Sequence, residues 1–218
     1  MPALKLVIGN KNYSSWSMRP WLALRANDIP FDEVFIPLYT DNPADKDRIL
    51  SFSLAGKVPT LVDGDVTVWD SLAIIEYLAE KFPEKKLWPE DPASRAHARS
   101  ISAEMHSGFA ALRNECGMNL HRPIRAVALS DDARANVARI QQIWSECHQR
   151  YGGPFLFGAF SAADAMYAPV VHRFRTYAIE VAPSARHYFD AMQTLPAFQQ
   201  WTREGLAETL IIERMEVL

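Results

Sequence analysis

Residues 57–71 read KVPTLVDGDVTVWDS, and this stretch determines how the first third of the chain folds. Two short runs rich in β-branched residues, 60–63 and 66–69, flank Gly64-Asp65, a pair typical of a two-residue hairpin turn. Residues at the spacing of one helix face follow at Ser71, Ile74, Ile75, Leu78 and Phe82. The stretch therefore predicts a β-hairpin followed directly by an amphipathic helix.

The residues before this hairpin predict a parallel pair of strands. Leu4–Ile8 and 31–36 have the composition of short strands, and 16–26 between them has helical spacing. A strand, helix and strand at this spacing form a right-handed βαβ unit. With a weaker helix at 41–52, the predicted order is βαβαββα.

The rest of the chain predicts only helices. Three prolines between 83 and 92 interrupt the helical pattern and indicate a connection between domains. Ser161-Ala162-Ala163-Asp164 has the spacing of a capping box. Further helices are expected at 93–120, 130–151, 165–174, 184–195 and 196–206. We therefore expect an α/β domain at 1–82, a linker at 83–91 and an all-α bundle at 92–218.

Composition excludes several classes of protein. The 218 residues are 49% hydrophobic with a formal net charge of −3, which indicates a folded chain and argues against a nucleic-acid partner. The N-terminal apolar run is too short for a signal peptide, and no run approaches the length of about 18 apolar residues that spans a membrane. Two cysteines without motif spacing and scattered histidines favour a cytoplasmic protein with no metal site.

A cluster of hydroxyl groups precedes the first predicted helix, in residues 12–20, NYSSWSMRP. The N–H groups and dipole of a helix start favour an anion, and a hydroxyl there could lower the pKa of a bound thiol from about 8.5. The alternative is that Ser14 or Ser15 is only the N-cap of the helix.

Two further features lie in the opening stretch. Pro59 stands at the mouth of a strand, and a cis bond there would expose the Val58 backbone for pairing with a peptide; the alternative is an ordinary proline at a strand start. Asp70 is a natural N-cap, but Asp70 and Ser71 together could also bind the ammonium and carboxylate of an amino acid.

These motifs together resemble those of the cytosolic glutathione transferases over nearly the whole chain. Residues 14–19, SSWSMR, resemble the Ser-Ser-Cys-Ser-x-Arg motif of the zeta, maleylacetoacetate isomerase-like type. Residues 57–61 and 70–78 resemble the family's cis-proline and glutathione motifs, and 161–164 its capping box. The resemblance implies a thioredoxin-like N-terminal domain, an all-α C-terminal domain, bound glutathione and a homodimer.

The resemblance also implies roles for individual residues. Ser14, with Ser15 close behind, would face the glutathione sulfur. The remainder of glutathione would be bound by Lys57, Val58, Pro59, Asp70 and Ser71. Trp16 departs from the zeta pattern because it replaces the cysteine, and we expect it to reshape the pocket for the second substrate.

The second-substrate pocket is expected between the two domains. Candidates to line it, besides Tyr13 and Trp16, are His106, Phe109, Arg113 and Met118, although residues at such spacing are often core. Arg173 and Arg175 could attract an acidic substrate, or could face a helix end and water. Cys116 has no motif around it, and we expect it to pack in the core.

The function predicted from these features is a glutathione transferase. It would activate the glutathione thiolate for attack on a small electrophile, giving a conjugate or a cis–trans isomer. The alternative is a non-catalytic interaction module of the same fold.

Overall fold

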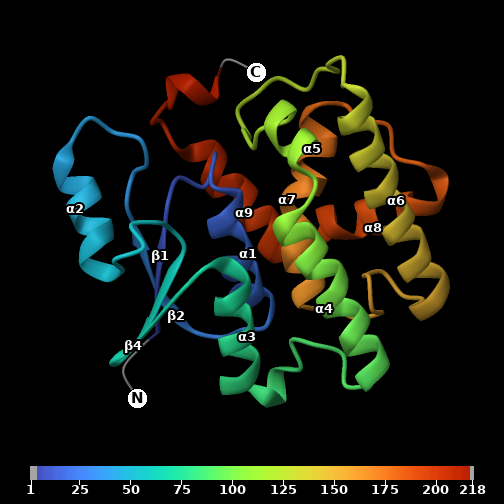
Figure 1. Cartoon of the computed structure of the whole chain (residues 1–218), viewed down its shortest axis with the longest axis horizontal. Coiled ribbons are helices and arrows are strands. Elements are labelled where there is room, and N and C mark those ends of the chain that lie inside the picture. Colours follow the sequence, from blue (N-terminus) through green and yellow to red (C-terminus); the bar gives the residue numbers. More distant parts are fainter. Residues whose placement is uncertain (1–3, 217–218) are drawn as a thin grey trace.

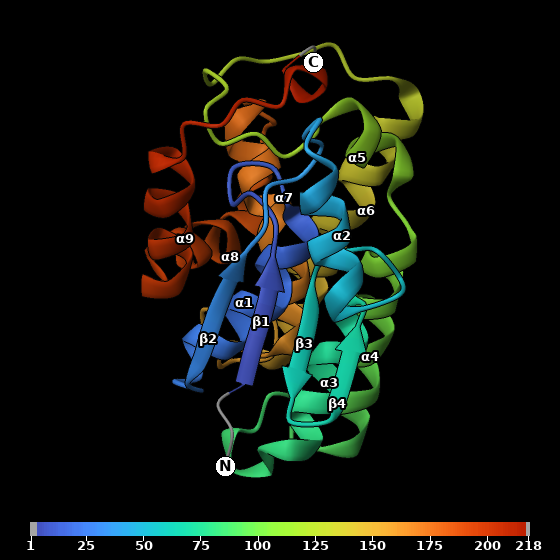
Figure 2. The ribbon, with the colours of Figure 1, turned by 90° about the vertical axis from the view of Figure 1, so that its left-hand side faces the viewer.

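A mixed four-stranded sheet forms the centre of the N-terminal part of the protein. In the computed structural model, which describes residues 4–216, the strand order is β2-β1-β3-β4 (Figure 2). The strands are β1 (Leu4–Ile8), β2 (Phe31–Phe35), β3 (Thr60–Asp63) and β4 (Val66–Trp69). β1 pairs with β2 in parallel, and β3 is antiparallel to both β1 and β4. The outermost residues of the two predicted domains, 1–3 and 217–218, lie outside the described residues.

Helices cover both faces of this sheet. The N-terminal helices are α1 (Ser15–Ala26), α2 (Pro43–Phe52) and α3 (Ser71–Lys81). α1 and α3 share a core with Leu6, Ile8 and Leu61, whereas Ile49 of α2 packs with Val7 on the opposite face. The order of elements is βαβαββα, so the fold predicted for this part is confirmed.

The C-terminal part is helical (Figure 1). Its helices are α4 (Pro92–Ser107), α5 (Ala110–Glu115), α6 (Asp131–Tyr151), α7 (Ala162–Thr176), α8 (Pro183–Thr194) and α9 (Pro196–Ala207). Short 3-10 helices η1 (Pro83–Lys85) and η2 (Glu213–Met215) lie before and after them. The all-α character predicted for this part is confirmed, with η1 and a proline-rich connection between α3 and α4.

The prediction of one long helix at 93–120 is wrong. α4 ends at Ser107, and Phe109 adopts a left-handed conformation with φ of 57° before α5 begins. A Cβ atom on Gly108 would lie 2.6 Å from the backbone oxygen of Glu104, so this position requires glycine. After Glu115 the chain has no helix until Asp131. The break starts α5, whose Arg113 donates to the backbone oxygens of His106, at 3.2 Å, and Gly108, at 3.3 Å, at the end of α4.

The capping box predicted at 161–164 forms and anchors α7 inside the bundle. Asp164 is fully buried and accepts hydrogen bonds from the backbone N–H groups of Ser161, at 2.7 Å, and Leu156, at 3.0 Å. Nearly every residue of α7 is buried. A helix buried all round is the centre of its bundle.

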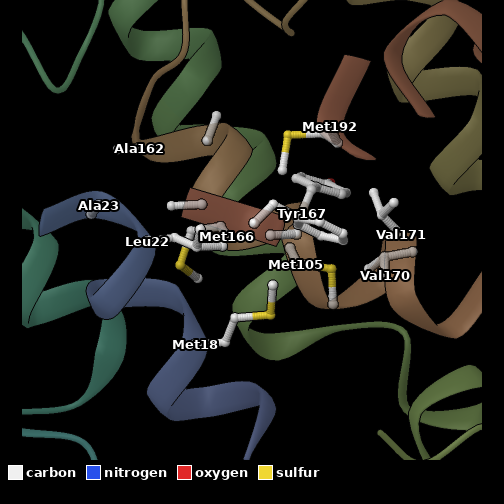
Figure 3. Packing of buried hydrophobic residues seen from close by; sticks show 14 of the residues in the cluster. Met18, Leu22, Ala23, Met105, Ala162, Met166, Tyr167, Val170, Val171 and Met192 are labelled. Carbon is white, nitrogen blue, oxygen red and sulfur yellow. The ribbon is translucent and has the colours of Figure 1, made fainter. Parts of the chain in front are cut away.

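The two parts of the chain share one core, in which α1 packs against α7 (Figure 3). Met18 and Leu22 of α1 lie beside Met166 of α7 and Met105 of α4 (Figure 3). The Arg19 side chain crosses the interface, where its Nε donates to the backbone oxygen of Met166 at 3.1 Å. The position of the first helix is therefore fixed by both the sheet and the bundle.

Two features are absent from residues 4–216. No helix within that range is long and apolar enough to cross a membrane. Nor does any group of three or more His, Cys, Asp or Glu side chains there have an arrangement able to hold a metal ion.

His172 is a buried imidazole that gives a testable pH dependence of stability. Its ring stacks on Phe198, with centroids 4.2 Å apart, and burial together with Arg175 and Arg173 lowers its pKa from 6.5 to about 3. Below about pH 6.5 this histidine is protonated in the unfolded chain but stays neutral in the folded protein. Protonation therefore stabilises the unfolded state, and the free energy of unfolding falls as the pH is lowered from 6.5.

We expect His172→Gln to lose about 2 kcal/mol less stability than the wild type when the pH is lowered from 6.5 to 5. Urea unfolding at the two pH values measures the difference. His148→Gln, which changes an exposed histidine, is the control. An equal loss of stability in the wild type and the His172 variant would contradict the assignment.

Candidate functional site

The serine loop ends in the N-cap of α1. Ser14 is the cap residue, and its Oγ accepts the Ser17 backbone N–H at 3.2 Å. The Ser14 and Ser17 hydroxyl oxygens lie 2.8 Å apart, and Ser17 Oγ also accepts the backbone N–H of Gly9 at 3.1 Å. Ser14 keeps 7% of its surface exposed, whereas Ser17 is fully buried. The N-cap interpretation of Ser14 is therefore correct, and the residue as a whole keeps a small exposed surface.

A cavity of about 450 Å³ lies beside this helix start. Three segments that are distant in sequence form its wall: Trp16 from α1, the loop before β3, and the junction of β4 and α3. The lining residues are Trp16, Ala55, Lys57, Val58, Pro59, Trp69, Asp70 and Ser71. Six of the predicted site residues thus share one cavity.

The backbone at Val58 is available to a ligand. The Val58-Pro59 peptide bond is cis, and strand pairing in β3 starts only at Thr60. Val58 therefore lies on the cavity wall with main-chain groups outside the sheet ladder. An extended peptide can pair with such an edge.

Asp70 and Ser71 begin α3 at the opposite wall. Asp70 Oδ1 accepts the backbone N–H groups of Leu72, at 2.9 Å, and Ala73, at 3.2 Å, so the residue is an N-cap. The hydroxyl of Ser71 is buried and has no hydrogen-bond partner among the described residues. A buried unpaired hydroxyl on a cavity wall is well suited to a polar ligand.

Two guanidinium groups and one imidazole contact Trp16. The guanidinium carbons of Arg19 and Arg113 lie 4.3 and 4.6 Å from the centre of its ring. His106 meets the same ring edge-on at 5.3 Å, and its Nε2 lies 3.2 Å from Asp70 Oδ2. α4 and α5 of the bundle thereby border the cavity of the N-terminal part.

A third guanidinium group, that of Arg173 in α7, lies near Ser15 at the start of α1. It donates to the backbone oxygen of Cys116 at 2.8 Å and to Ser15 Oγ at 3.4 Å. Burial, followed by repulsion from Arg173 and Arg113, lowers the pKa of Arg19 to about 9. Burial and then Arg113 lower the pKa of Arg173 to about 10. Both pKa values are lowered because the guanidinium groups are buried away from water and lie near other positive charges.

None of the three guanidinium groups forms a salt bridge within residues 4–216. One nitrogen each of Arg19 and Arg173, Nη1, is also buried without a hydrogen-bond partner. Buried charges are ordinarily paired with an opposite charge. The cluster is therefore electrostatically incomplete and favours an anion.

Several predicted site residues lie elsewhere. The Tyr13 hydroxyl contacts Glu216 and accepts the Ile212 backbone N–H at 3.3 Å, so it is bound to the C-terminal segment. Arg175 is exposed and lines a different cavity, between α7, α8 and α9. Phe109 and Met118 are buried core residues. Cys116 is buried too, in accordance with its predicted packing role.

Sequence reasoning missed three residues of this site. Trp69 is 55% exposed and lines the cavity with Ala55, but it ends a strand without any motif around it. Arg19 belongs to the motif at 14–19, yet its contact with Trp16 could not be read from spacing. The presence of Arg19 in that motif was the one feature of the sequence that could have pointed to a role in the site.

Comparison with known proteins agrees with this geometry. Residues 13–81 match the family model of the glutathione S-transferase N-terminal domain, and residues 95–204 match that of the C-terminal domain. A maleylacetoacetate isomerase of Rattus norvegicus is 30% identical, with 91% of this chain and 93% of the rat protein covered. A probable maleylacetoacetate isomerase of Caenorhabditis elegans is 29% identical, with 85% and 87% covered.

The fold has solved counterparts. A glutathione transferase homologue from Burkholderia, crystallised with bound glutathione, superimposes with a TM-score of 0.71 at 23% identity, covering 94% of this chain and all of that one.

The chain belongs to the glutathione S-transferase family. It is a glutathione-dependent enzyme of the thioredoxin-like fold with a helical C-terminal domain. Its relatives are named both glutathione transferase and maleylacetoacetate isomerase, so both conjugation and isomerisation lie within the range of the family.

Proposed function

We propose that the cavity beside α1 binds glutathione and presents its thiolate to a small anionic electrophile. The observation that carries this proposal is the cavity wall itself, where Val58, Asp70 and Ser71 converge at the start of α1. No feature of the described residues favours the alternative of a non-catalytic module. Such a module would have no need for an unpaired Ser71 hydroxyl on a cavity wall.

Each part of glutathione finds a complementary group. The Ser71 hydroxyl and the N-terminus of α3 bind the γ-glutamyl carboxylate, and Asp70 binds the ammonium group. The Val58 backbone pairs with the cysteinyl unit, and Pro59 orients that backbone. Lys57 is exposed on the cavity wall and reaches the glycyl carboxylate as a point charge.

Ser14 is the hydroxyl that stabilises the sulfur. Tyr13 is excluded from this role because its oxygen is bound to the C-terminal segment. Ser15 lies within reach of Arg173, whereas Ser14 combines a hydroxyl with the N-terminal N–H groups of α1. A thiolate there gains a charge-assisted hydrogen bond and the positive end of the helix dipole.

The second substrate is expected to carry a carboxylate. Arg113 on Trp16 and the buried Arg173 provide uncompensated positive charge on the side of the cavity that faces the bundle. An anion there would pair with the guanidinium groups and offset the cost of their burial. Bound glutathione supplies the nucleophile, and the electrophile leaves as a conjugate or as a cis–trans isomer.

The role of Ser14 is tested by Ser14→Ala. We expect the pKa of the bound glutathione thiol to rise by about one to two units, because one hydrogen bond to a charged group is lost. The affinity for glutathione should change little. Titration of the ultraviolet absorbance of the thiolate, in the complex, gives the pKa. Ser15→Ala is the matched control, and an unchanged titration in Ser14→Ala would reject the assignment.

The charge of the second substrate is tested by Arg113→Leu. For an α,β-unsaturated ketone that carries a carboxylate, kcat/KM should fall about tenfold, since a partly buried ion pair is lost. The methyl ester of the same compound should be affected less than twofold. Arg113→Lys keeps the charge and serves as the control. Equal losses for acid and ester would contradict an anionic substrate.

We also propose that the protein is a cytoplasmic homodimer. Cys116 and Cys147 are free and buried, which fits a reducing compartment. Leu54, Val66 and Trp69 are large apolar residues on the N-terminal part with 93%, 46% and 55% of their surface exposed, and such surfaces commonly mark interfaces. Light scattering is expected to give twice the chain mass of 24.7 kDa, and a stable monomer at micromolar concentration would contradict this.

A further inference from the structure

The hydroxyl of Ser17 has an unusual position for a residue in the first turn of a helix. Ser17 is fully buried, three residues after the N-cap Ser14. Its backbone N–H already donates to Ser14 Oγ, as in an ordinary cap. Its side chain therefore contributes nothing further to capping, and instead lies 2.8 Å from the Ser14 hydroxyl.

Either of the two hydroxyl groups can be the donor in this contact. A hydroxyl has one proton to donate and two lone pairs to accept with. Ser17 Oγ accepts from the Gly9 backbone N–H, and Ser14 Oγ accepts from the Ser17 backbone N–H. One lone pair and one proton remain on each oxygen, and only one proton can lie between them.

The two possible arrangements differ in what they leave unpaired. If Ser14 donates to Ser17, the proton of the fully buried Ser17 has no other acceptor within the described part of the chain. If Ser17 donates to Ser14, the proton of Ser14 is left for another acceptor, and Ser14, with 7% of its surface exposed, is the less buried of the two residues. Leaving the proton of the fully buried Ser17 unpaired costs more free energy than leaving that of Ser14 unpaired. A ligand that accepts the Ser14 proton therefore favours the second arrangement.

We infer that Ser17 is a positioning residue, which orients the Ser14 proton toward the glutathione sulfur through a relay from the Gly9 N–H to Ser17 and from Ser17 to Ser14. This inference rests on the proposed role of Ser14. Each donor in the chain polarises the next, and such chains strengthen the terminal hydrogen bond by about 10–30% per bond. The relay needs no net proton transfer, because every proton stays on its own oxygen or nitrogen.

The relay is tested by Ser17→Ala in the complex with glutathione. We expect the pKa of the bound thiol, read from the ultraviolet titration, to rise by about half a unit, a smaller effect than that of Ser14→Ala. Ser17→Thr, which keeps a hydroxyl at this position, should restore the wild-type titration. Ser102→Ala removes a hydroxyl of α4 that is as buried as that of Ser17 but has no hydrogen-bond partner among the described residues, and is the control for loss of a buried serine.

The double variant separates the relay from a general disturbance of the site. If Ser17 acts only through Ser14, then adding Ser17→Ala to Ser14→Ala leaves the titration of Ser14→Ala unchanged. A further shift in the double variant would overturn the relay, as would a wild-type titration in Ser17→Ala alone. If Ser14→Ala itself has no effect, the proposed function of Ser14 fails and the relay fails with it. A shift in Ser14→Ala but none in Ser17→Ala rejects only the relay.

Discussion

The burial of α1 between the sheet and α7 is the constraint on which the rest of the site depends. Met18 and Leu22 pack into a core shared by both parts of the chain, and Arg19 donates to the backbone of Met166. A helix held in this way cannot shift without opening the core. Its first turn, and with it the N-cap Ser14, is consequently placed at a fixed point beside the cavity.

The loop before α1 is fixed just as firmly, from two directions. The backbone oxygen of Asn10 accepts the N–H groups of Tyr13 and Ser14 at 3.1 and 2.7 Å. The side-chain oxygen of Asn12 accepts the N–H groups of Leu120, at 2.6 Å, and His121, at 3.1 Å, which come from the C-terminal part. These bonds hold the N-cap residue in place, so its hydroxyl need not rearrange when a charge forms beside it.

The same interface concentrates the positive charges of Arg19, Arg113 and Arg173, which form no salt bridge within residues 4–216, although the carboxylate of Asp70 attracts Arg19. Arg19 and Arg173 bury their guanidinium groups at the junction of α1 and α7, and each keeps one nitrogen unpaired. Burying unpaired charge has a cost, which a bound anion would offset. Under the proposed function, the packing of the two domains therefore bears on the choice of substrate. Trp16, which occupies the position of the cysteine in the zeta motif, is the surface on which Arg19 and Arg113 rest.

Local signals made much of this structure predictable. The hairpin at Gly64-Asp65, the helix from Ser71 and the capping box at Ser161 each depend on residues close together in the chain, and all three form. The break after Gly108 was missed because it depends on the backbone of Glu104 and on the conformation of Phe109.

Contacts between distant residues decided the other differences. For Arg173 and Arg175 the sequence left two alternatives open, attraction of an acidic substrate or a position at a helix end facing water. Residues two apart on a helix point about 200° apart, and Arg173 is buried beside Ser15 whereas Arg175 is exposed at a different cavity. Tyr13 was a candidate for the pocket, yet it binds Glu216 and Ile212, about two hundred residues later in the chain. Residue spacing in the sequence cannot predict a hydrogen-bond partner so far along the chain.

The central claim is that glutathione lies along the Val58 edge with its sulfur at Ser14, and a crystal structure of the complex with glutathione tests it most directly. The account predicts the sulfur within about 3.5 Å of Ser14 Oγ, the γ-glutamyl group at Ser71 and the cysteinyl backbone paired with Val58. Glutathione bound outside this cavity, or inside it with the sulfur turned away from Ser14, would contradict the account.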